Sequence, residues 1–321
     1  MISQALGDTD LRLSTLGLGS WALGAGKGGS SGLGPQDDRD SVATVHRALE
    51  VGVNWIDTAA SYGIGHAERV MARALRGVSE RPYVFTKCGT VYDAEGRERH
   101  HLKAASIRAE IDGSLNRLEV DALDLVYVHQ PFPPEDLEEA WATLADLEGA
   151  GKIRHLGASN FSAGQLDAVA AIAPVAALQV KYSLVERRAE AEVLPYCEER
   201  GIGALVYSTL HHGLLAGTMT AERVAQLPAS DFRRTHRDFT EPRLSAHAAL
   251  VAALGAIADR RGCSRSEVAI AWALRNGAVV GAIVGCRRPE QVDAVVGAVD
   301  LRLTESELEE LERLSGAPTP G

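Results

Sequence analysis

Short, continuous apolar runs alternate along the chain with longer segments in which apolar residues recur at helical spacing. Such runs are typical of strands that are buried on both faces, and a period of roughly three to four residues is typical of amphipathic helices. The pattern predicts eight strands, at residues 16–20, 53–57, 83–87, 123–129, 153–159, 177–182, 204–208 and 279–285.

Helical spacing fills most of the intervals between these strands. It predicts helices at residues 37–51, 66–75, 104–118, 134–149, 162–171, 187–200, 245–261, 265–275, 289–298 and 304–314. Thr304 and Glu307 have the spacing of a capping box at the start of the last helix. Eight strands that mostly alternate with helices fit a closed (β/α)8 TIM barrel better than an open α/β sheet.

Length and composition set the number of domains. A chain of 321 residues with 45% hydrophobic content can bury one barrel-sized core or two smaller ones. No linker rich in Pro or Ser divides the chain, so we expect a single domain over residues 1–321. We expect it to include an N-terminal segment at 1–15, a long loop at 209–244 at the C-terminal face and a C-terminal helix within 304–315.

Charge and cysteine content exclude several classes of protein. A net charge of −10 and a pI near 5.5 give no general basic field, so we expect neither nucleic acid nor a membrane as a partner. The N-terminus lacks a basic segment followed by an apolar core, and no apolar run approaches the ~20 residues that span a bilayer, which predicts a cytoplasmic protein. The four cysteines form no Cys-x-x-Cys pair, which predicts reduced thiols.

Polar residues close most of the predicted strands. In a (β/α)8 barrel the carboxyl ends of the strands form one face, and that face carries the active site. The predicted fold therefore brings these side chains together. They are Asp57, Lys87, His129, Ser159 with Asn160, Gln179, Tyr207 with Ser208, and Arg287.

Tyr62, in the loop after the second strand, completes a candidate acid-base group. A phenol ionises at about pH 10, so a cation such as Lys87 has to lower its pKa for it to act as an acid at neutral pH. Asp57 can hold the lysine ammonium group, and His129 can donate to a substrate oxygen. Each residue alone is more often a loop cap, a surface charge or a packed side chain, but convergence from separate segments favours catalysis.

Two further patterns are weaker. Residues 24–29 match the dinucleotide-binding pattern G-x-G-x-x-G, but the pattern requires a helix to begin there, and the next predicted helix begins later. The pairs His100 with His101 and His211 with His212 have no carboxylate or cysteine at ligand spacing. We therefore predict neither a dinucleotide loop at residues 24–29 nor a metal site.

The motifs at the strand ends closely resemble those of the aldo-keto reductase family. They read NWIDTAASYG from Asn54, TK from Thr86, VYVH from Val126, GASNF from Gly157, YSTL from Tyr207 and GLLAG from Gly213. The resemblance extends over residues 16–298. It implies an NAD(P)H-dependent carbonyl reductase in which Tyr62 protonates the carbonyl oxygen, Lys87 lowers the pKa of Tyr62, Asp57 orients Lys87 and His129 positions the oxygen.

The same resemblance implies the cofactor contacts. The planar fork of Arg287 suits a 2′-phosphate, which favours NADPH (NADP+) over NADH. Val295 stands where the family often has an asparagine, and Thr209 and His212 replace a proline and a glutamine of the usual loop. The other expected contacts are Ser159, Asn160 and Gln179 with the nicotinamide carboxamide, Tyr207 with its ring, Ser208, Leu210 and Gly213 with the pyrophosphate, and Gly285 and Gln291 with the adenosine.

The motifs identify the substrate-binding residues less clearly than the catalytic and cofactor-binding residues. The expected partner is a small-molecule carbonyl compound, whether an aldehyde, a ketone or a sugar. Nothing in the sequence indicates a dimer interface or identifies the physiological substrate. The expected substrate contacts are Trp21 and Tyr92, with Gln130, Phe161, His212 and Phe232 as further candidates.

Two other functions fit the same motifs. The family also includes accessory subunits of potassium channels that bind NADPH with little turnover, so an NADPH-sensing subunit is one alternative. A barrel lyase that forms a Schiff base on Lys87 is another. Turnover of a panel of aldehydes would argue against the first, and trapping of a substrate adduct on Lys87 would support the second.

Overall fold

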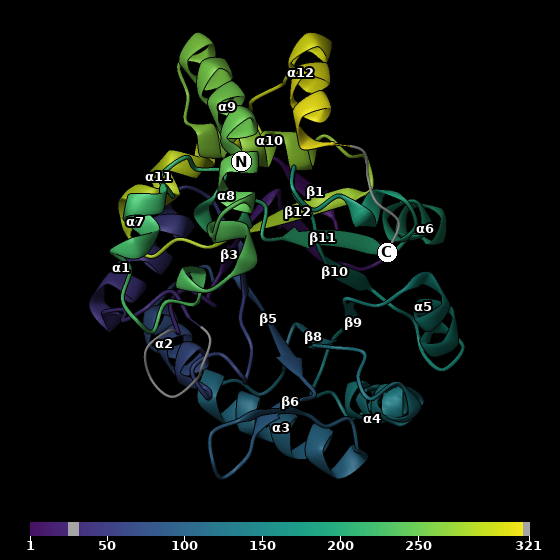
Figure 1. The fold of residues 1–321 in the computed structure, drawn as a ribbon. Coiled ribbons are helices and arrows are strands. Elements are labelled where there is room, and N and C mark those ends of the chain that lie inside the picture. Colours follow the sequence, from purple (N-terminus) through teal and green to yellow (C-terminus); the bar gives the residue numbers. More distant parts are fainter. Residues whose placement is uncertain (25–31, 317–321) are drawn as a thin grey trace.

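Eight parallel strands close into a barrel in the computed structural model, which describes residues 1–24 and 32–316. Neighbouring strands pair in sequence order around the ring, and the last strand pairs with the first. Figure 1 shows this ring with helices outside it. The predicted (β/α)8 barrel is confirmed. Its strands are β3 (Leu16–Gly19), β4 (Trp55–Asp57), β5 (Tyr83–Cys88), β8 (Leu125–Val128), β9 (Leu156–Ser159), β10 (Ala177–Lys181), β11 (Gly203–Tyr207) and β12 (Val279–Val284).

The helices cover the barrel with their apolar faces. In α2 (His66–Leu75), for example, Ala67, Val70, Met71 and Ala74 recur at helical spacing and are all buried. The bounds of α2 and of α3 (Ala104–Leu118) agree with the predicted ranges. The remaining covering helices are α1 (Asp38–Glu50), α4 (Leu137–Gly149), α5 (Ala163–Ala170), α6 (Val193–Arg200), α10 (Arg265–Leu274) and α11 (Pro289–Val296).

Two additional helices, α9 (Ala248–Arg261) and α12 (Glu305–Ser315), lie side by side outside the ring, at the top of Figure 1. An ion pair of 2.7 Å between Arg261 and Glu307 joins them. Thr304 and Glu307 form the predicted capping box, in which the hydroxyl oxygen of Thr304 accepts from the backbone N–H of Glu307 and the Glu307 carboxylate accepts from the backbone N–H of Thr304.

Several predicted helices are divided in the structure. The range 134–149 consists of a 3-10 turn, η1 (Pro134–Asp136), followed by α4, and 187–200 consists of η2 (Arg188–Glu190) followed by α6. The range 245–261 overlaps α8 (Arg243–Ala246) and α9. A 3-10 turn commonly begins a helix because it needs fewer residues per turn, and the apolar spacing alone does not reveal it.

The segment 209–244 contains short helices that its irregular pattern does not predict. They enclose a small apolar cluster of Leu214, Val224, Phe239 and Leu244. This cluster gives the long loop its own buried contacts, separate from those of the barrel. The helices are η3 (His211–Gly213), α7 (Ala221–Ala225), η4 (Phe232–Arg234) and η5 (Arg237–Phe239), followed by α8.

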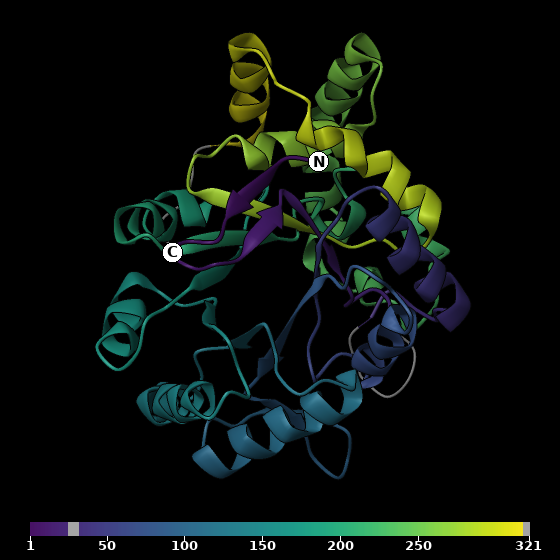
Figure 2. The same cartoon turned by 180° about the vertical axis from the view of Figure 1, so that it is seen from behind.

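Two hairpins lie at the ends of the barrel. The N-terminal hairpin of β1 (Ser3–Ala5) and β2 (Arg12–Ser14) closes one end, seen in purple in Figure 2. Its residues Leu11 and Leu13 are buried against the interior, and the indole N–H of Trp55 donates to the Ser14 carbonyl oxygen at 2.8 Å. A second hairpin of β6 (Thr90–Tyr92) and β7 (Glu98–His100) follows β5. Neither was predicted as a hairpin, because these short strands are partly polar.

The barrel interior is filled by aromatic rings that pack against one another in tilted and edge-on contacts, together with the N-terminal hairpin. The ring centroids of Trp55 and Phe85 lie 5.5 Å apart, and those of Phe85 and Tyr127 lie 6.4 Å apart. Gly17 of β3 provides the space for Trp55, because a Cβ at that position would lie 2.2 Å from the indole. In residues 1–24 and 32–316 no helix is both long enough and apolar enough to cross a membrane.

Candidate active site

A cleft of about 1330 Å³ opens at the carboxyl ends of the barrel strands. It gathers the residues that the strand-end motifs predicted, although they come from most of the chain. The exception is Lys87, whose side chain lies buried beneath the cleft wall. The predicted residues that line the cleft are Trp21, Asp57, Tyr62, Tyr92, His129, Ser159, Asn160, Gln179, Tyr207, Ser208, Leu210, Gly213, Gly285, Arg287 and Gln291.

A buried ion pair forms the base of this cleft. Lys87 Nζ donates to Asp57 Oδ1 at 2.5 Å and to the Thr58 carbonyl oxygen at 2.8 Å. The Gln179 amide donates to the other carboxylate oxygen of Asp57 at 2.7 Å. Burial raises the pKa of Asp57 and lowers that of Lys87, and the attraction between the two charges opposes both shifts. The pair therefore holds the ammonium group in one place.

Tyr62 lies above this ion pair. Lys87 Nζ is 4.9 Å from the centroid of the Tyr62 ring. Burial raises the pKa of the Tyr62 phenol well above its usual range, and the carboxylates of Asp57 and Glu98 raise it further. The sequence motifs predicted that Lys87 lowers this pKa. The structure gives the opposite direction, because the phenol is removed from water and faces two carboxylates. At neutral pH the phenol is protonated and can act only as a proton donor.

His129 packs beside Tyr62, with its ring edge-on at 5.8 Å between centroids. Burial lowers the pKa of His129 well below its usual range, and the charges of Lys87 and His100 lower it further, so the imidazole is neutral. Ser61 Oγ lies 3.4 Å from His129 Nδ1. With the hydroxyl as donor to Nδ1, the ring proton is on Nε2, free to donate to a bound oxygen. Ser61 was not predicted as a site residue, although it directly precedes Tyr62.

Neighbouring strand ends form the middle of the cleft. The Tyr207 hydroxyl donates to Asn160 Oδ1 at 2.9 Å, and the Asn160 amide donates to Ser159 Oγ at 3.0 Å. Asn160 and Ser208 both have positive φ angles, of 64° and 59°, so their backbones turn sharply at the cleft wall. Ser208 Oγ is buried and has no hydrogen-bond partner among the described residues. An unpartnered buried hydroxyl in a cleft is a ready donor for a ligand.

Gln179 has a contact that the sequence did not indicate. Its amide nitrogen donates to Asp57, across the barrel from β10 to β4, and its side chain also lines the cleft. The contact with the nicotinamide carboxamide that the resemblance implied stays a prediction. Gln179 therefore also positions the Asp57–Lys87 pair, a role that the spacing of motifs along the chain does not reveal.

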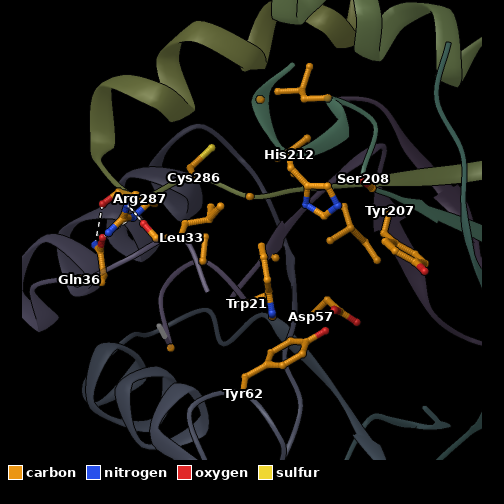
Figure 3. Close-up of a pocket in the computed structure, with 18 of the residues that line it drawn as sticks. Trp21, Leu33, Gln36, Asp57, Tyr62, Tyr207, Ser208, His212, Cys286 and Arg287 are labelled. Carbon is orange, nitrogen blue, oxygen red and sulfur yellow. Dashed lines mark hydrogen bonds between the residues drawn. The ribbon is translucent and has the colours of Figure 1, made fainter. Parts of the chain in front are cut away.

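Arg287, at the far end of the cleft, binds the chain segment 33–36. Its guanidinium donates to Gln36 Oε1 at 2.7 Å, to the Leu33 carbonyl oxygen at 2.8 Å and to the Pro35 carbonyl oxygen. The Gln36 amide donates back to the Arg287 carbonyl oxygen at 2.9 Å. Figure 3 shows this link at one end, Tyr62 with Asp57 at the other, and Trp21 and His212 between them. Gln36 follows a glycine-rich stretch and has no motif that would have indicated it.

This cleft suits an extended dinucleotide. It is elongated, and it presents polar side chains and sharply turned backbone along β9 to β12. Its volume exceeds what a small substrate alone needs. The acid-base residues are at one end only, as expected if the nicotinamide and the substrate meet there. Apart from Gly24, which lines the cleft, the G-x-G-x-x-G match at 24–29 lies outside the described residues.

The remaining sequence candidates have other surroundings. Gln130 and His212 line the cleft, whereas Phe161 packs against Trp141 and Phe232 packs edge-on against His212. His211 pairs with Asp238 at 3.0 Å. Within residues 1–24 and 32–316, no three His, Cys, Asp or Glu side chains gather in a way that could hold a metal ion.

Sequence comparisons place these features in a family. A sequence model of the Aldo/keto reductase family matches residues 15–315. The aldo-keto reductase YhdN of Bacillus subtilis (strain 168) is 35% identical over 293 residues, which cover 91% of this chain and 86% of that protein. The protein named NADH-specific methylglyoxal reductase of Escherichia coli (strain K12) is 34% identical over 318 residues, 94% of each chain.

Solved structures superpose on this chain over nearly its whole length. Glycerol dehydrogenase AKR11B4 from Gluconobacter oxydans superposes with a TM-score of 0.88 at 34% identity, covering 99% of this chain and 96% of that one. The holo form of aldo-keto reductase AKR11C1 from Bacillus halodurans superposes with a TM-score of 0.79 at 23% identity, covering 100% and 98%, and shares the fold. The resemblance drawn from the motifs is confirmed: the chain is an oxidoreductase that belongs to the aldo-keto reductase family.

Proposed function

We propose that this protein reduces the carbonyl group of a small aldehyde, ketone or sugar, using a nicotinamide dinucleotide and Tyr62 as the proton donor. The observation that carries the proposal is the convergence of Tyr62, His129 and the Asp57–Lys87 pair at one end of a dinucleotide-sized cleft. The relatives support a small substrate, since methylglyoxal and glycerol, in two of their names, are small uncharged molecules.

In the proposed mechanism this chain supplies the proton and the electrostatic environment. The reduced nicotinamide, when bound, supplies the hydride. The Tyr62 hydroxyl gives its proton to the carbonyl oxygen, and the buried ammonium of Lys87 stabilises the phenolate that is left. Asp57 holds that ammonium in place, and His129 donates from Nε2 to the same carbonyl oxygen and so orients it.

A Schiff-base lyase fits the site less well. Lys87 Nζ is bonded to Asp57 and to the Thr58 carbonyl oxygen, and its side chain is fully buried. A nucleophilic amine has to be unprotonated and accessible to substrate, whereas this one is held as an ammonium ion below the cleft. These contacts favour an electrostatic role for Lys87.

Cofactor binding and turnover test this proposal directly. NADPH and NADH are titrated by fluorescence, and turnover is then followed by the loss of absorbance of the reduced cofactor with aldehydes, ketones and keto sugars. Binding with turnover supports the reductase. Binding without turnover on any compound would favour the NADPH-sensing subunit instead, and no binding would contradict the proposal. The cytoplasmic location stays a prediction from the sequence.

We propose NADPH as the preferred cofactor, through Arg287. Arg287→Ala should weaken NADPH binding by about 10- to 100-fold and NADH binding much less, because charge-assisted hydrogen bonds to a 2′-phosphate contribute about 1.5–3 kcal/mol. The measurement is the Kd of each cofactor. Gln36→Ala is the matched control, because it removes one partner of Arg287 and leaves the guanidinium. Equal weakening of both cofactors by Arg287→Ala would mean that Arg287 only holds segment 33–36.

The pH dependence should differ between the two reaction directions. The pKa of Tyr62 lies above its usual range, so the phenol is protonated at neutral and mildly alkaline pH. Reduction, which needs the protonated form, should therefore be nearly independent of Tyr62 ionisation between about pH 6 and about pH 9, whereas alcohol oxidation, which needs the phenolate, should rise throughout. Profiles of kcat/KM in both directions check this. A decline in kcat/KM for reduction at about pH 7 to 8 would instead show that the pKa of Tyr62 is lowered.

A further inference from the structure

The hairpin of β6 and β7 forms one wall of the cleft beside Tyr62. It leaves the end of β5 shortly after Lys87, and Thr90, Tyr92 and Glu98 all line the cleft. Tyr92 and Glu98 face each other across the hairpin, and the Tyr92 hydroxyl donates to Glu98 Oε2 at 3.4 Å. The negative charge of Glu98 extends to the catalytic phenol, since it contributes to the raised pKa of Tyr62.

The arginines of the hairpin pair with other carboxylates. Arg97 pairs with Asp93 at 2.9 Å and with Glu95 at 2.7 Å, and Arg99 pairs with Asp93 at 3.0 Å. Glu98 has no ion-pair partner within residues 1–24 and 32–316, and its carboxylate keeps lone pairs that the weak Tyr92 contact does not use. Asp93 and Glu95, which are paired with arginines, lie on the hairpin turn, whereas the unpaired Glu98 lines the cleft.

Within residues 1–24 and 32–316, no lysine or arginine beside Tyr62 pairs with Glu98. Asp57 and Lys87 neutralise each other at 2.5 Å, and burial keeps His129 neutral through its lowered pKa. Burial likewise lowers the pKa of His212, which lines the same cleft, to about 3. Arg287 is at the opposite end of the cleft, bonded to segment 33–36. A substrate beside Tyr62 therefore meets the carboxylate of Glu98, whose charge no ion pair within the described residues offsets.

We propose that Glu98 selects substrates by charge: it accepts a hydrogen bond from a hydroxyl group of an uncharged, hydroxylated carbonyl compound and disfavours carbonyl compounds that carry a carboxylate. This inference rests on the proposed reductase function and names its substrate class. A carboxylate accepts strongly from a hydroxyl donor, and it repels a second carboxylate. Glu98 is exposed, so water screens this repulsion, which corresponds to a change of roughly three- to tenfold in kcat/KM.

The charge test uses succinic semialdehyde and its methyl ester, which have the same reacting aldehyde and differ in charge. The wild-type protein should prefer the neutral ester by roughly three- to tenfold in kcat/KM, and Glu98→Gln should bring the ratio close to one. Glu95→Gln is the matched control, because Glu95 is on the same hairpin but pairs with Arg97, and it should leave the ratio unchanged. Salt should narrow the wild-type ratio but not that of Glu98→Gln, because only a charge effect is screened.

The hydroxyl test uses glyceraldehyde and propionaldehyde. The wild-type preference for glyceraldehyde should decrease about fivefold or more in Glu98→Gln, mainly through KM, and Glu98→Asp should restore part of it. Turnover with unchanged ratios in Glu98→Gln would overturn this inference alone. If neither the ester nor the uncharged aldehydes are reduced at all, the proposed function fails, and the inference fails with it.

Discussion

Tyr62→Phe should lower kcat for carbonyl reduction by about 100- to 10,000-fold and leave the Kd of the cofactor nearly unchanged. The substitution removes the proton donor and keeps the ring that packs against His129 and lies near the Lys87 ammonium. General acid catalysis contributes a factor of this size, and the contacts along the rest of the cleft stay intact. Single-turnover reduction and a fluorescence titration of the same sample provide the measurement.

A matched variant makes this test specific. Tyr92→Phe removes a phenol from the same cleft, one that contacts Glu98 rather than the ion pair, and should retain most of the turnover. An unchanged kcat in Tyr62→Phe would assign the proton to another group. A large loss of cofactor affinity in Tyr62→Phe would instead indicate that the phenol organises the cleft.

Lys87→Met should destabilise the fold by about 3–5 kcal/mol at neutral pH and abolish reduction. It leaves the Asp57 carboxylate buried with the Gln179 amide as its remaining side-chain partner, and an uncompensated buried charge costs about that much. Loss of the ammonium also removes the group that stabilises the phenolate of Tyr62. Denaturant unfolding and aldehyde turnover measure the two effects separately.

The destabilisation by Lys87→Met should depend on pH, and the pKa of Asp57 sets its direction. Burial raises its pKa in the folded state, and removal of Lys87 takes away the attraction that opposes this shift. An acid whose folded pKa exceeds its unfolded pKa stabilises the fold at low pH and loses that contribution as pH rises. The penalty of Lys87→Met should therefore be smaller at about pH 5 than at about pH 8.

A double variant separates charge from packing. Lys87→Met combined with Asp57→Asn removes both charges of the pair and should recover much of the stability but none of the activity. Equal instability of the single and double variants would mean that the loss comes from packing around the long lysine side chain rather than from the buried carboxylate.

The alternation of strands and helices was enough to predict the fold, and the polar residues at strand ends together with the family motifs predicted most of the cleft. Parallel strands in a barrel place their carboxyl ends on one face, so residues as distant as Asp57 and Arg287 could be assigned to the same site without knowledge of any contact. The ends of α2 and α3 could also be predicted, because their apolar residues keep a helical period up to a clear boundary.

The properties that could not be predicted depend on burial or on long-range partners. The raised pKa of Tyr62 follows from its burial and from the charges of Asp57 and Glu98, and Glu98 lies on a hairpin of short, partly polar strands. The Arg287 guanidinium bonds to Gln36, 251 residues earlier in the chain. The bond between Gln179 and Asp57 crosses the barrel interior and depends on the register of the whole ring. Neither strand patterns nor turn signals carry this information.

The packed aromatic rings inside the barrel have a consequence for how this protein can acquire new specificities. Lys87 lies above the last of these rings, with Nζ 5.8 Å from the centroid of Tyr127, so the reacting groups stand on a support that packs down to the N-terminal hairpin. Glu98, which we propose selects the substrate, lies instead on the hairpin of β6 and β7, outside that column. Evolution, or a mutant library, can therefore vary this hairpin without disturbing the interior packing. Because the charge of Glu98 also raises the pKa of Tyr62, a change there would alter specificity and proton transfer together.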